Sequence, residues 1–295
     1  MDYLTKYGYT PDQEAISRAL EIIAANLENV GSEQVYKDCF SMMDLTTLKT
    51  DDTPASVEKL VGKVNAFNET YPDWPLPASV CIYPNFAKTV KDARKADFNI
   101  TVVSACFPSS QSFLEVKLKE CEMAVEQGAD EVDIVLALNS FLAGDYEKAS
   151  EEISAVRKTI DAVAEKQGRK VHLKVILETG LLRKPELIAQ ASFLAMEAGA
   201  DFIKTSTGKV DVNATPVAAY VMCECIAKYH AATGKKIGFK PAGGISSAAD
   251  ALCYYSIVAS VLGKEWLNKE LFRFGVSRVA NSIISAVEQK TVSYY

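Results

Sequence analysis

Eight short apolar segments alternate with helical patterns along this chain of 295 residues. The alternation predicts a single (β/α)8 TIM barrel with an extra N-terminal helix. The length and a hydrophobic content of 48% fit one α/β domain with a large core. A doubly wound open sheet would use the same elements, but no GxGxxG motif follows the first expected strand. Eight strand–helix units in about 250 residues favour the closed barrel.

The expected strands are short runs of β-branched and other apolar residues. Their regular alternation with helices indicates parallel strands joined by right-handed crossovers. The barrel is expected to span residues 38–295, with a mobile C-terminal tail at 290–295. The eight expected strands lie at residues 39–45, 79–83, 100–106, 131–138, 172–178, 202–206, 237–241 and 272–276.

Helix signals separate these strands. Residues 145–167 carry apolar side chains at steps of three and four, and Gly168 stands where a helix commonly ends. Thr215 and Pro216 supply an N-cap and a first-turn proline for the helix after the sixth strand, and Gly234 can end that helix.

An N-terminal extension at residues 1–37 precedes the barrel. Thr10-Pro11-Asp12-Gln13 resembles a capping box, and an apolar stripe follows at Ile16, Leu20, Ile23 and Leu27. We expect this helix to pack against the barrel, at its bottom, or against a neighbouring subunit, which would make the protein a homodimer.

Composition limits the classes of partner. A net charge of -6 argues against nucleic acid. Two histidines and no HExxH motif disfavour a metal site, and seven irregularly spaced cysteines indicate buried thiols. The N-terminal residues lack the apolar run of a signal peptide, and no apolar stretch is long enough to span a membrane. The expected location is the cytoplasm.

Charged residues occur inside runs that a barrel should keep apolar. Because side chains alternate along a strand, Phe202 and Lys204 share one face, and so do Gly238 and Lys240. A lysine facing the helices would be buried among apolar side chains, so the barrel interior near its C-terminal mouth is the expected direction. The charged residues of this kind are Asp44, Asp133, Lys174, Glu178, Lys204 and Lys240.

Two interpretations of these charges stay open. The residues could form ion pairs that tie strands together, Asp133 with Lys240 and Lys174 with Glu178. Alternatively, they form a catalytic site with a nucleophilic lysine. A lysine with a pKa of about 10.4 is protonated at neutral pH, whereas a second ammonium within about 4–6 Å in a desolvated pocket favours the nucleophilic amine. Lys204 and Lys240 lie on neighbouring expected strands, so this arrangement is geometrically allowed.

The loops after the last three expected strands suit a phosphate group. Glycines let the backbone approach an anion, and serine, lysine and arginine side chains can donate to it. The segment around Gly208 is not a Walker A loop, because Val210 replaces its Ser or Thr. The candidate phosphate-binding residues are Gly208, Lys209, Gly243, Gly244, Ser246, Gly275, Ser277 and Arg278.

Several motifs together resemble one family. Those with lysines are Asp201-Phe202-Ile203-Lys204-Thr205-Ser206-Thr207-Gly208-Lys209, Gly238-Phe239-Lys240-Pro241-Ala242-Gly243-Gly244 and Lys174-Val175-Ile176-Leu177-Glu178-Thr179-Gly180. Met43-Asp44-Leu45-Thr46-Thr47-Leu48, Cys81-Ile82-Tyr83-Pro84 and Gly128-Ala129-Asp130-Glu131-Val132-Asp133 add to them. From about residue 38 to residue 295, the chain resembles the class I deoxyribose-phosphate aldolases.

The resemblance implies a role for each matching position. Lys204 would form a Schiff base, Lys240 would perturb its pKa, and Asp133 would relay protons. The loop residues named above would hold the phosphate, while Asp44 and Thr46 would lie near the rest of the substrate. Cys81 would lie near the pocket, although a buried strand thiol is the better interpretation. Tyr295, on the mobile tail, would visit the mouth and assist proton transfer.

The chain also departs from the family pattern. Cys106 replaces an asparagine, and Ser109-Ser110-Gln111 replaces a histidine-glycine turn. Ser246 stands where an arginine is common, and Arg278 where a second serine is common. Arg278 is therefore expected to supply the guanidinium missing from the loop after the seventh strand.

The predicted reaction is the reversible cleavage of 2-deoxy-D-ribose 5-phosphate to acetaldehyde and D-glyceraldehyde 3-phosphate, with no metal or organic cofactor. Three alternatives remain open: a Schiff-base aldolase with a ketose donor, a metal-free isomerase using Asp44 and Asp133 as acid and base, and a binding module without catalysis.

Overall fold

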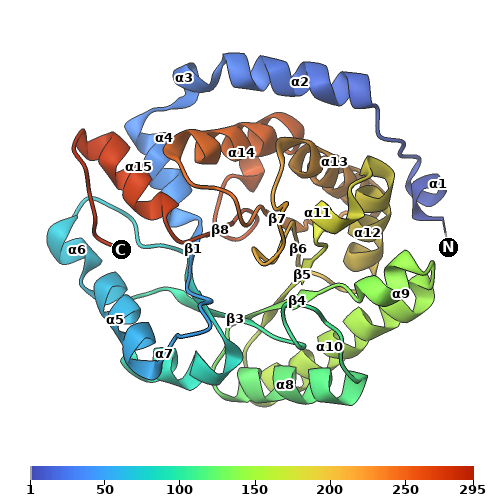
Figure 1. The fold of residues 1–295 in the computed structure, drawn as a ribbon, viewed down its shortest axis with the longest axis horizontal. Helices are drawn as coiled ribbons and strands as arrows, with labels where there is room; N and C mark the ends of the chain where they lie inside the picture. Colours follow the sequence, from blue (N-terminus) through green and yellow to red (C-terminus); the bar gives the residue numbers. More distant parts are fainter. Residues whose placement is uncertain (1) are drawn as a thin grey trace.

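A computed structural model describes residues 2–295. Eight parallel strands are hydrogen-bonded in the order β7-β6-β5-β4-β3-β2-β1-β8, and helices surround them (Figure 1). Bridges between Phe239 and Phe272 and between Ala242 and Gly275 join β7 to the β8 segment and close the barrel. The strands are β1 (Met43–Thr46), β2 (Ser79–Ile82), β3 (Asn99–Val103), β4 (Glu131–Val135), β5 (His172–Ile176), β6 (Phe202–Lys204), β7 (Gly238–Lys240) and β8 (Phe274–Val276).

Each predicted strand overlaps an observed one, but the observed strands are shorter. Cys39 lies in helix α4 (Glu33–Ser41) and not in β1, and Leu138 begins α9 (Leu138–Leu142). After β1 come the helices α5 (Pro54–Asn65), α6 (Phe67–Thr70), η1 (Pro84–Phe86), α7 (Ala87–Ala93), α8 (Leu114–Glu126), α10 (Tyr146–Lys166), α11 (Thr179–Leu182), α12 (Pro185–Glu197), α13 (Pro216–Thr233), α14 (Ala248–Val261), η2 (Lys264–Trp266) and α15 (Val279–Glu288).

The predicted capping signals are present. The Thr215 side chain accepts a hydrogen bond from the Ala218 N–H at the start of α13, and Gly234 ends that helix with a φ of 73°. Gly168 follows the end of α10 with a φ of 66°. A hydroxyl side chain caps the start of a helix, and glycine readily adopts the left-handed conformation at its end, so both kinds of position can be recognised in the sequence.

The N-terminal region contains more helix than the single one predicted. The structure has α1 (Tyr3–Tyr7), α2 (Gln13–Ala25), α3 (Leu27–Val30) and then α4, which spans both sides of the expected boundary at residue 37. Asp12, rather than Thr10, caps α2. Helix α2 contacts α13 and α14 and lies outside them, on the side of the barrel rather than at its bottom (Figure 1).

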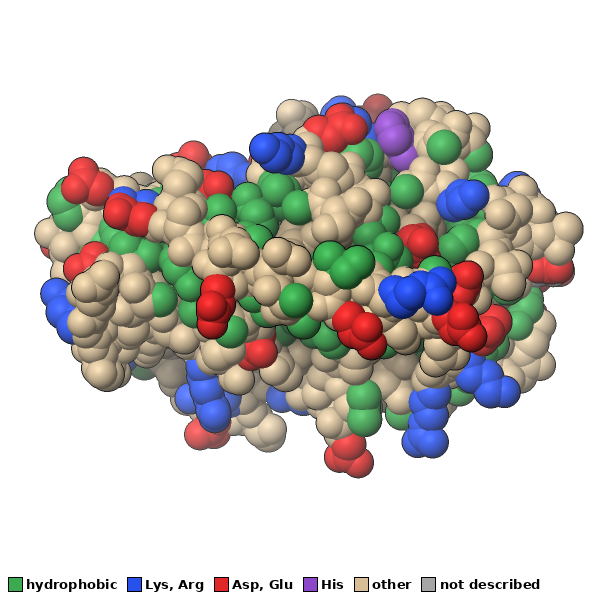
Figure 2. All heavy atoms as spheres, turned by 90° about the horizontal axis from the view of Figure 1, so that it is seen from above, with side chains coloured by type: hydrophobic (Ala, Val, Ile, Leu, Met, Phe, Trp, Pro, Cys, Tyr) green, Lys and Arg blue, Asp and Glu red, His purple; other side chains and the backbone are tan. Residues whose placement is uncertain are grey.

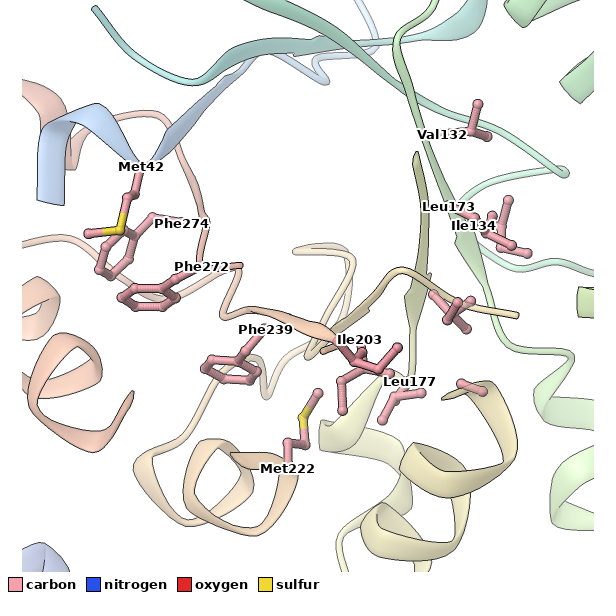
Figure 3. Close-up of a cluster of buried hydrophobic side chains, with 14 of the residues drawn as sticks. Met42, Val132, Ile134, Leu173, Leu177, Ile203, Met222, Phe239, Phe272 and Phe274 are labelled. Atoms are coloured by element: carbon pink, nitrogen blue, oxygen red, sulfur yellow. The ribbon is translucent and has the colours of Figure 1, made fainter. Parts of the chain in front are cut away.

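The main hydrophobic core lies between the strands and the surrounding helices. Figure 3 shows Ile203, Phe239, Phe272 and Phe274 on the helix side of the strands, where they meet side chains such as Met222. Since side chains alternate along a strand, residues 202, 204, 238, 240, 273 and 275 face the barrel interior. The main hydrophobic core therefore does not occupy the barrel interior.

The outer surface mixes charges. On the face that carries α2, acidic and basic side chains are interspersed with apolar ones (Figure 2). Among the described residues, no helix combines the length and the apolar character that crossing a membrane requires.

Candidate active site

A cluster of seven charged side chains fills the barrel interior. Each is at most 4% exposed. Such burial is rare for charged groups unless they are paired. The members are Asp44 on β1, Glu131 and Asp133 on β4, Lys174 on β5, Lys204 on β6, Lys240 on β7 and Arg273 immediately before β8.

Asp133 lies at the centre of this cluster. Its Oδ1 accepts a hydrogen bond from Lys174 Nζ at 3.0 Å. Its Oδ2 accepts from both Lys204 Nζ and Lys240 Nζ, each at 2.8 Å. Lys204 and Lys240 are direct neighbours in the register of β6 and β7. The two lysines therefore converge on one carboxylate oxygen, as the sequence predicted they would converge on one site.

The environment of Lys204 lowers the pKa of its ammonium group. Burial contributes most to lowering its pKa, the Asp133 carboxylate opposes this effect, and the Lys240 ammonium lowers the pKa further. The net charge of the cluster also favours a lower pKa for Lys204, because the cluster holds three carboxylates and four cations. Releasing one proton from Lys204 leaves the buried cluster without net charge.

Lys240 is held as an ammonium. Burial alone would lower its pKa, but the Asp133 and Asp44 carboxylates outweigh this effect and raise it. Asp44 Oδ2 lies 2.5 Å from Lys240 Nζ, although the angle of this contact is not that of a hydrogen bond. The pKa values of the two lysines thus shift in opposite directions, downward for Lys204 and upward for Lys240.

Glu131 and Arg273 belong to the cluster and were missed in the sequence. Arg273 Nη2 donates to Glu131 Oε1 at 2.8 Å, and Arg273 Nη1 donates to Asp44 Oδ1 at 2.7 Å. Glu131 also accepts hydrogen bonds from Lys174, Thr101 and Asn99. The signal that could have found them is the period of two, since Glu131 precedes Asp133, and Arg273 precedes Gly275, by two residues on the interior face.

The predicted structural ion pairs are present only in part. Asp133 does pair with Lys240. Lys174 pairs with Glu131 and Asp133, and the prediction that it pairs with Glu178 is wrong. Glu178 follows β5 and instead accepts hydrogen bonds from the N–H and the hydroxyl of Thr207, in the loop after β6.

A cavity of about 260 Å3 lies at the C-terminal mouth beside Lys204. The N–H groups of Gly208, Gly243 and Ser277 have no hydrogen-bond partner among the described residues, so they remain available to a ligand. Gly208 and Gly243 have φ values of 78° and 74°, which favour glycine. The predicted site residues that line this cavity are Thr46, Lys204, Gly208, Lys209, Gly243, Gly275 and Ser277.

Four other candidates lie outside this cavity. Ser246 donates its N–H and hydroxyl to Asp250, next to the N-terminus of α14, and neither Ser246 nor Gly244 lines the cavity beside Lys204. Arg278 and Tyr295 line a second cavity, between α5 and the start of α15. The Tyr295 ring stacks on Phe67, with the ring centroids 5.7 Å apart. Mobility of this tail stays a prediction.

Cysteine thiols and possible metal ligands are the remaining groups of interest. Cys81 is fully buried next to Leu48 and Val103, and burial raises the pKa of its thiol, in keeping with a strand thiol. Among residues 2–295, no group of three or more His, Cys, Asp or Glu side chains is arranged to hold a metal ion.

Known proteins are similar to this chain in fold and in sequence. The model of the DeoC/LacD family of aldolases matches residues 39–254. A deoxyribose-phosphate aldolase of Homo sapiens is 42% identical over 255 residues, which cover 82% of this chain and 77% of the human protein. One of Agrobacterium fabrum is 39% identical, covering 84% of this chain and 89% of its own. The structure of a deoxyribose-phosphate aldolase of Aeropyrum pernix, described as a tetramer, matches with a TM-score of 0.66 at 23% identity and covers 93% of this chain and 98% of its own.

Proposed function

The chain belongs to the DeoC/LacD family of aldolases, and from this premise we propose that it reversibly cleaves 2-deoxy-D-ribose 5-phosphate to acetaldehyde and D-glyceraldehyde 3-phosphate. Relatives of that name are about 40% identical over most of the chain. One observation carries the proposal: a lysine with a lowered pKa, Lys204, shares a cavity with unpaired loop N–H groups suited to a phosphate. The enzyme is accordingly a carbon–carbon lyase.

Lys204 is the proposed nucleophile. In the synthetic direction its neutral amine attacks the acetaldehyde carbonyl and forms a carbinolamine. Asp133, which touches Lys204 and Lys240, is placed to accept and return the protons that this step and the loss of water require. The resulting iminium loses a proton to give an enamine, and its carbon attacks the acceptor aldehyde. Water then releases the product and restores the amine.

Lys240 and Asp44 are proposed to prepare Lys204 for this chemistry. The Lys240 ammonium disfavours a second positive charge nearby, and Asp44 keeps Lys240 protonated. A covalent lysine adduct provides the electron sink of the aldol reaction, so this mechanism needs no cofactor.

The phosphate is proposed to bind across the loops after β6, β7 and β8. The N–H groups of Gly208, Gly243 and Ser277 would donate to its oxygens, and the Lys209 ammonium would add charge. Thr46, on the same cavity wall, would face the sugar. A small phosphorylated sugar is therefore the expected partner, and a homodimer stays a prediction.

Borohydride reduction in the presence of acetaldehyde tests the proposal. We expect a stable adduct on the peptide that contains Lys204, and loss of both adduct and turnover in Lys204→Met. The variant Lys209→Met is the matched control, since it keeps the amine and should still be trapped. Turnover retained in Lys204→Met would rule out the assignment. An isomerase or a binding module would give no adduct in the wild type.

The donor separates this proposal from its nearest rival. A Schiff-base aldolase with a ketose donor would accept dihydroxyacetone phosphate in the condensation reaction, whereas the proposed enzyme uses acetaldehyde. Condensation with each donor and D-glyceraldehyde 3-phosphate, followed by mass spectrometry of the product, distinguishes the two.

A further inference from the structure

A second cavity, of about 430 Å3, adjoins the one that contains Lys204. We call it the α5 cavity, because α5 forms one side and the start of α15 another. Thr46, Thr47, Lys49 and Ser277 line both cavities. A ligand in the α5 cavity would therefore lie next to a substrate phosphate.

Four cations line the α5 cavity: Lys49, Lys59, Lys63 and Arg278. Within residues 2–295, none of them has a carboxylate within ion-pair distance. Asp52 is the only acidic side chain among the described lining residues. It already accepts from the Thr47 hydroxyl at 2.8 Å and from the Lys49 N–H at 2.9 Å. The cavity thus carries an excess of positive charge in a chain whose net charge is -6.

The placement of these cations disfavours the empty state. Lys59 and Lys63 are four residues apart on α5, and like charges at this spacing repel each other and destabilise a helix. Tyr295 lies on the same cavity, with its ring packed on Phe67. An anion in the cavity would relieve the repulsion between the two lysines, because it attracts both.

We propose that the α5 cavity is a second anion-binding site, for a phosphate group, beside the substrate-phosphate site. Arg278 belongs to this second site: it lines the α5 cavity and not the cavity that contains Lys204. The phosphate comes either from a free anion or from the second phosphate of a bisphosphorylated sugar.

Equilibrium dialysis with inorganic phosphate tests the proposal without turnover, so its outcome is independent of the proposed reaction. We expect the wild type to bind two phosphate ions. Lys209→Met should weaken the ion in the Lys204 cavity, and Lys59→Met/Lys63→Met should weaken the other about tenfold or more. The control Lys158→Met/Lys166→Met removes two exposed lysines of α10 that form no ion pair among the described residues, and should keep both ions.

Two results would overturn the proposal. One is a single phosphate ion that is lost in Lys209→Met. The other is a second ion that the α10 control weakens as much as Lys59→Met/Lys63→Met does, because such binding would reflect net charge alone.

A 2-deoxypentose 1,5-bisphosphate identifies the source of the phosphate. If one molecule spans both sites, it binds about tenfold or more tightly than 2-deoxyribose 5-phosphate, and Lys59→Met/Lys63→Met abolishes the difference. If the second anion is free, the bisphosphate has no advantage, and inorganic phosphate still binds in the presence of the monophosphate.

Discussion

Lys204 and Lys240 donate hydrogen bonds to the same oxygen of Asp133, each at 2.8 Å, although their pKa values shift in opposite directions. The difference arises from the second carboxylate. Lys240 also has Asp44 beside it, whereas Lys204 has only Asp133 and lies at the cavity. Of the two lysines that share this carboxylate, the one without a second carboxylate beside it is therefore the one whose pKa is lowered.

Lys240→Met should raise the pKa of Lys204. The substitution removes the cation that opposes protonation of Lys204 and leaves Asp133 Oδ2 to Lys204 alone. A pKa increase of one unit lowers the neutral fraction about tenfold wherever the amine is mostly protonated. The acid limb of kcat/KM against pH should therefore move to higher pH, which steady-state kinetics across pH would show.

Lys209→Met is the control for that experiment. Lys209 lines the same cavity but donates to the Leu48 carbonyl and not to Asp133. It should raise KM for the phosphorylated substrate and leave the acid limb in place. An acid limb that stays unchanged in Lys240→Met would contradict the proposed role of Lys240.

Acid should destabilise the fold through the buried carboxylates. Despite the opposing effect of burial, their cationic neighbours hold the pKa values of Asp44, Glu131 and Asp133 below the ordinary values. Groups with depressed pKa values add stability that is complete above the unfolded pKa of about 4 and is lost as pH falls through the folded pKa. The free energy of unfolding from urea titrations should therefore fall below about pH 4, by up to about 1.4 kcal/mol per pH unit for each group.

Glu131→Gln should make this acid slope shallower by the contribution of one group. Asp97→Asn should not, because Asp97 is exposed and forms no ion pair among the described residues. A wild-type stability that stays constant between pH 5 and pH 3 would show that the pKa values of the interior carboxylates are not lowered by folding, which would contradict their pairing with the buried cations.

Arg273 should act as a positioning residue. It does not line the cavity, but it neutralises Asp44 and Glu131, and Asp44 in turn contacts Lys240. Arg273→Met leaves both carboxylates undercompensated and should lower the free energy of unfolding by about 3–5 kcal/mol. The loss of the Arg273 positive charge should also raise the pKa of Lys204 and move the acid limb of kcat/KM to higher pH.

Arg273→Lys separates positioning from general destabilisation. It restores the charge but not the two-pronged contact with Glu131. We expect the acid limb to return towards the wild type while part of the stability loss remains. If both Arg273 variants kept the wild-type pH profile, Arg273 would have a structural role only.

The barrel could be predicted from the sequence because each strand and helix leaves a local pattern. Strand ends were less predictable. Cys39 and Leu138 continue apolar runs, yet they lie in helices, because an apolar run alone does not distinguish a buried strand from a buried helix. Of the helices before β1, α2 was expected from its apolar stripe, whereas α1 and α3 have only five and four residues, too few to show a helical period.

Site residues could be predicted from the sequence where a charged side chain interrupts an apolar strand at a position that the period of two assigns to the barrel interior. Lys204, Lys240 and Asp133 stood out as charges inside apolar strands, and the structure brings them together. Arg273 was not predicted, although it lies within the strand expected at residues 272–276 and the period of two would have placed it on the interior face with Gly275. The position of Arg278 in the α5 cavity depends on how α15 begins, and no local pattern specifies this.

Gly238→Ala should disturb the charged cluster in the barrel interior by displacing the Phe202 ring. Gly238 is the register neighbour of Phe202, and a methyl group at Gly238 would come within 2.3 Å of that ring. The Phe202 ring lies under Lys174 Nζ and the Arg273 guanidinium, at 5.9 and 5.8 Å from its centroid. A displaced ring would shift these cations, so we expect a stability loss of about 1–3 kcal/mol and a lower kcat.

Gly62→Ala is the matched control for this substitution. Gly62 lies in α5, and a methyl group there would have no atom within 4 Å. Because alanine favours a helix over glycine, stability should rise by up to about 1 kcal/mol with kcat unchanged. Urea unfolding and steady-state kinetics of the two variants measure both effects. If Gly238→Ala behaved like Gly62→Ala, the Phe202 ring could move without disturbing Lys174 and Arg273, and its proposed role as their support would be wrong.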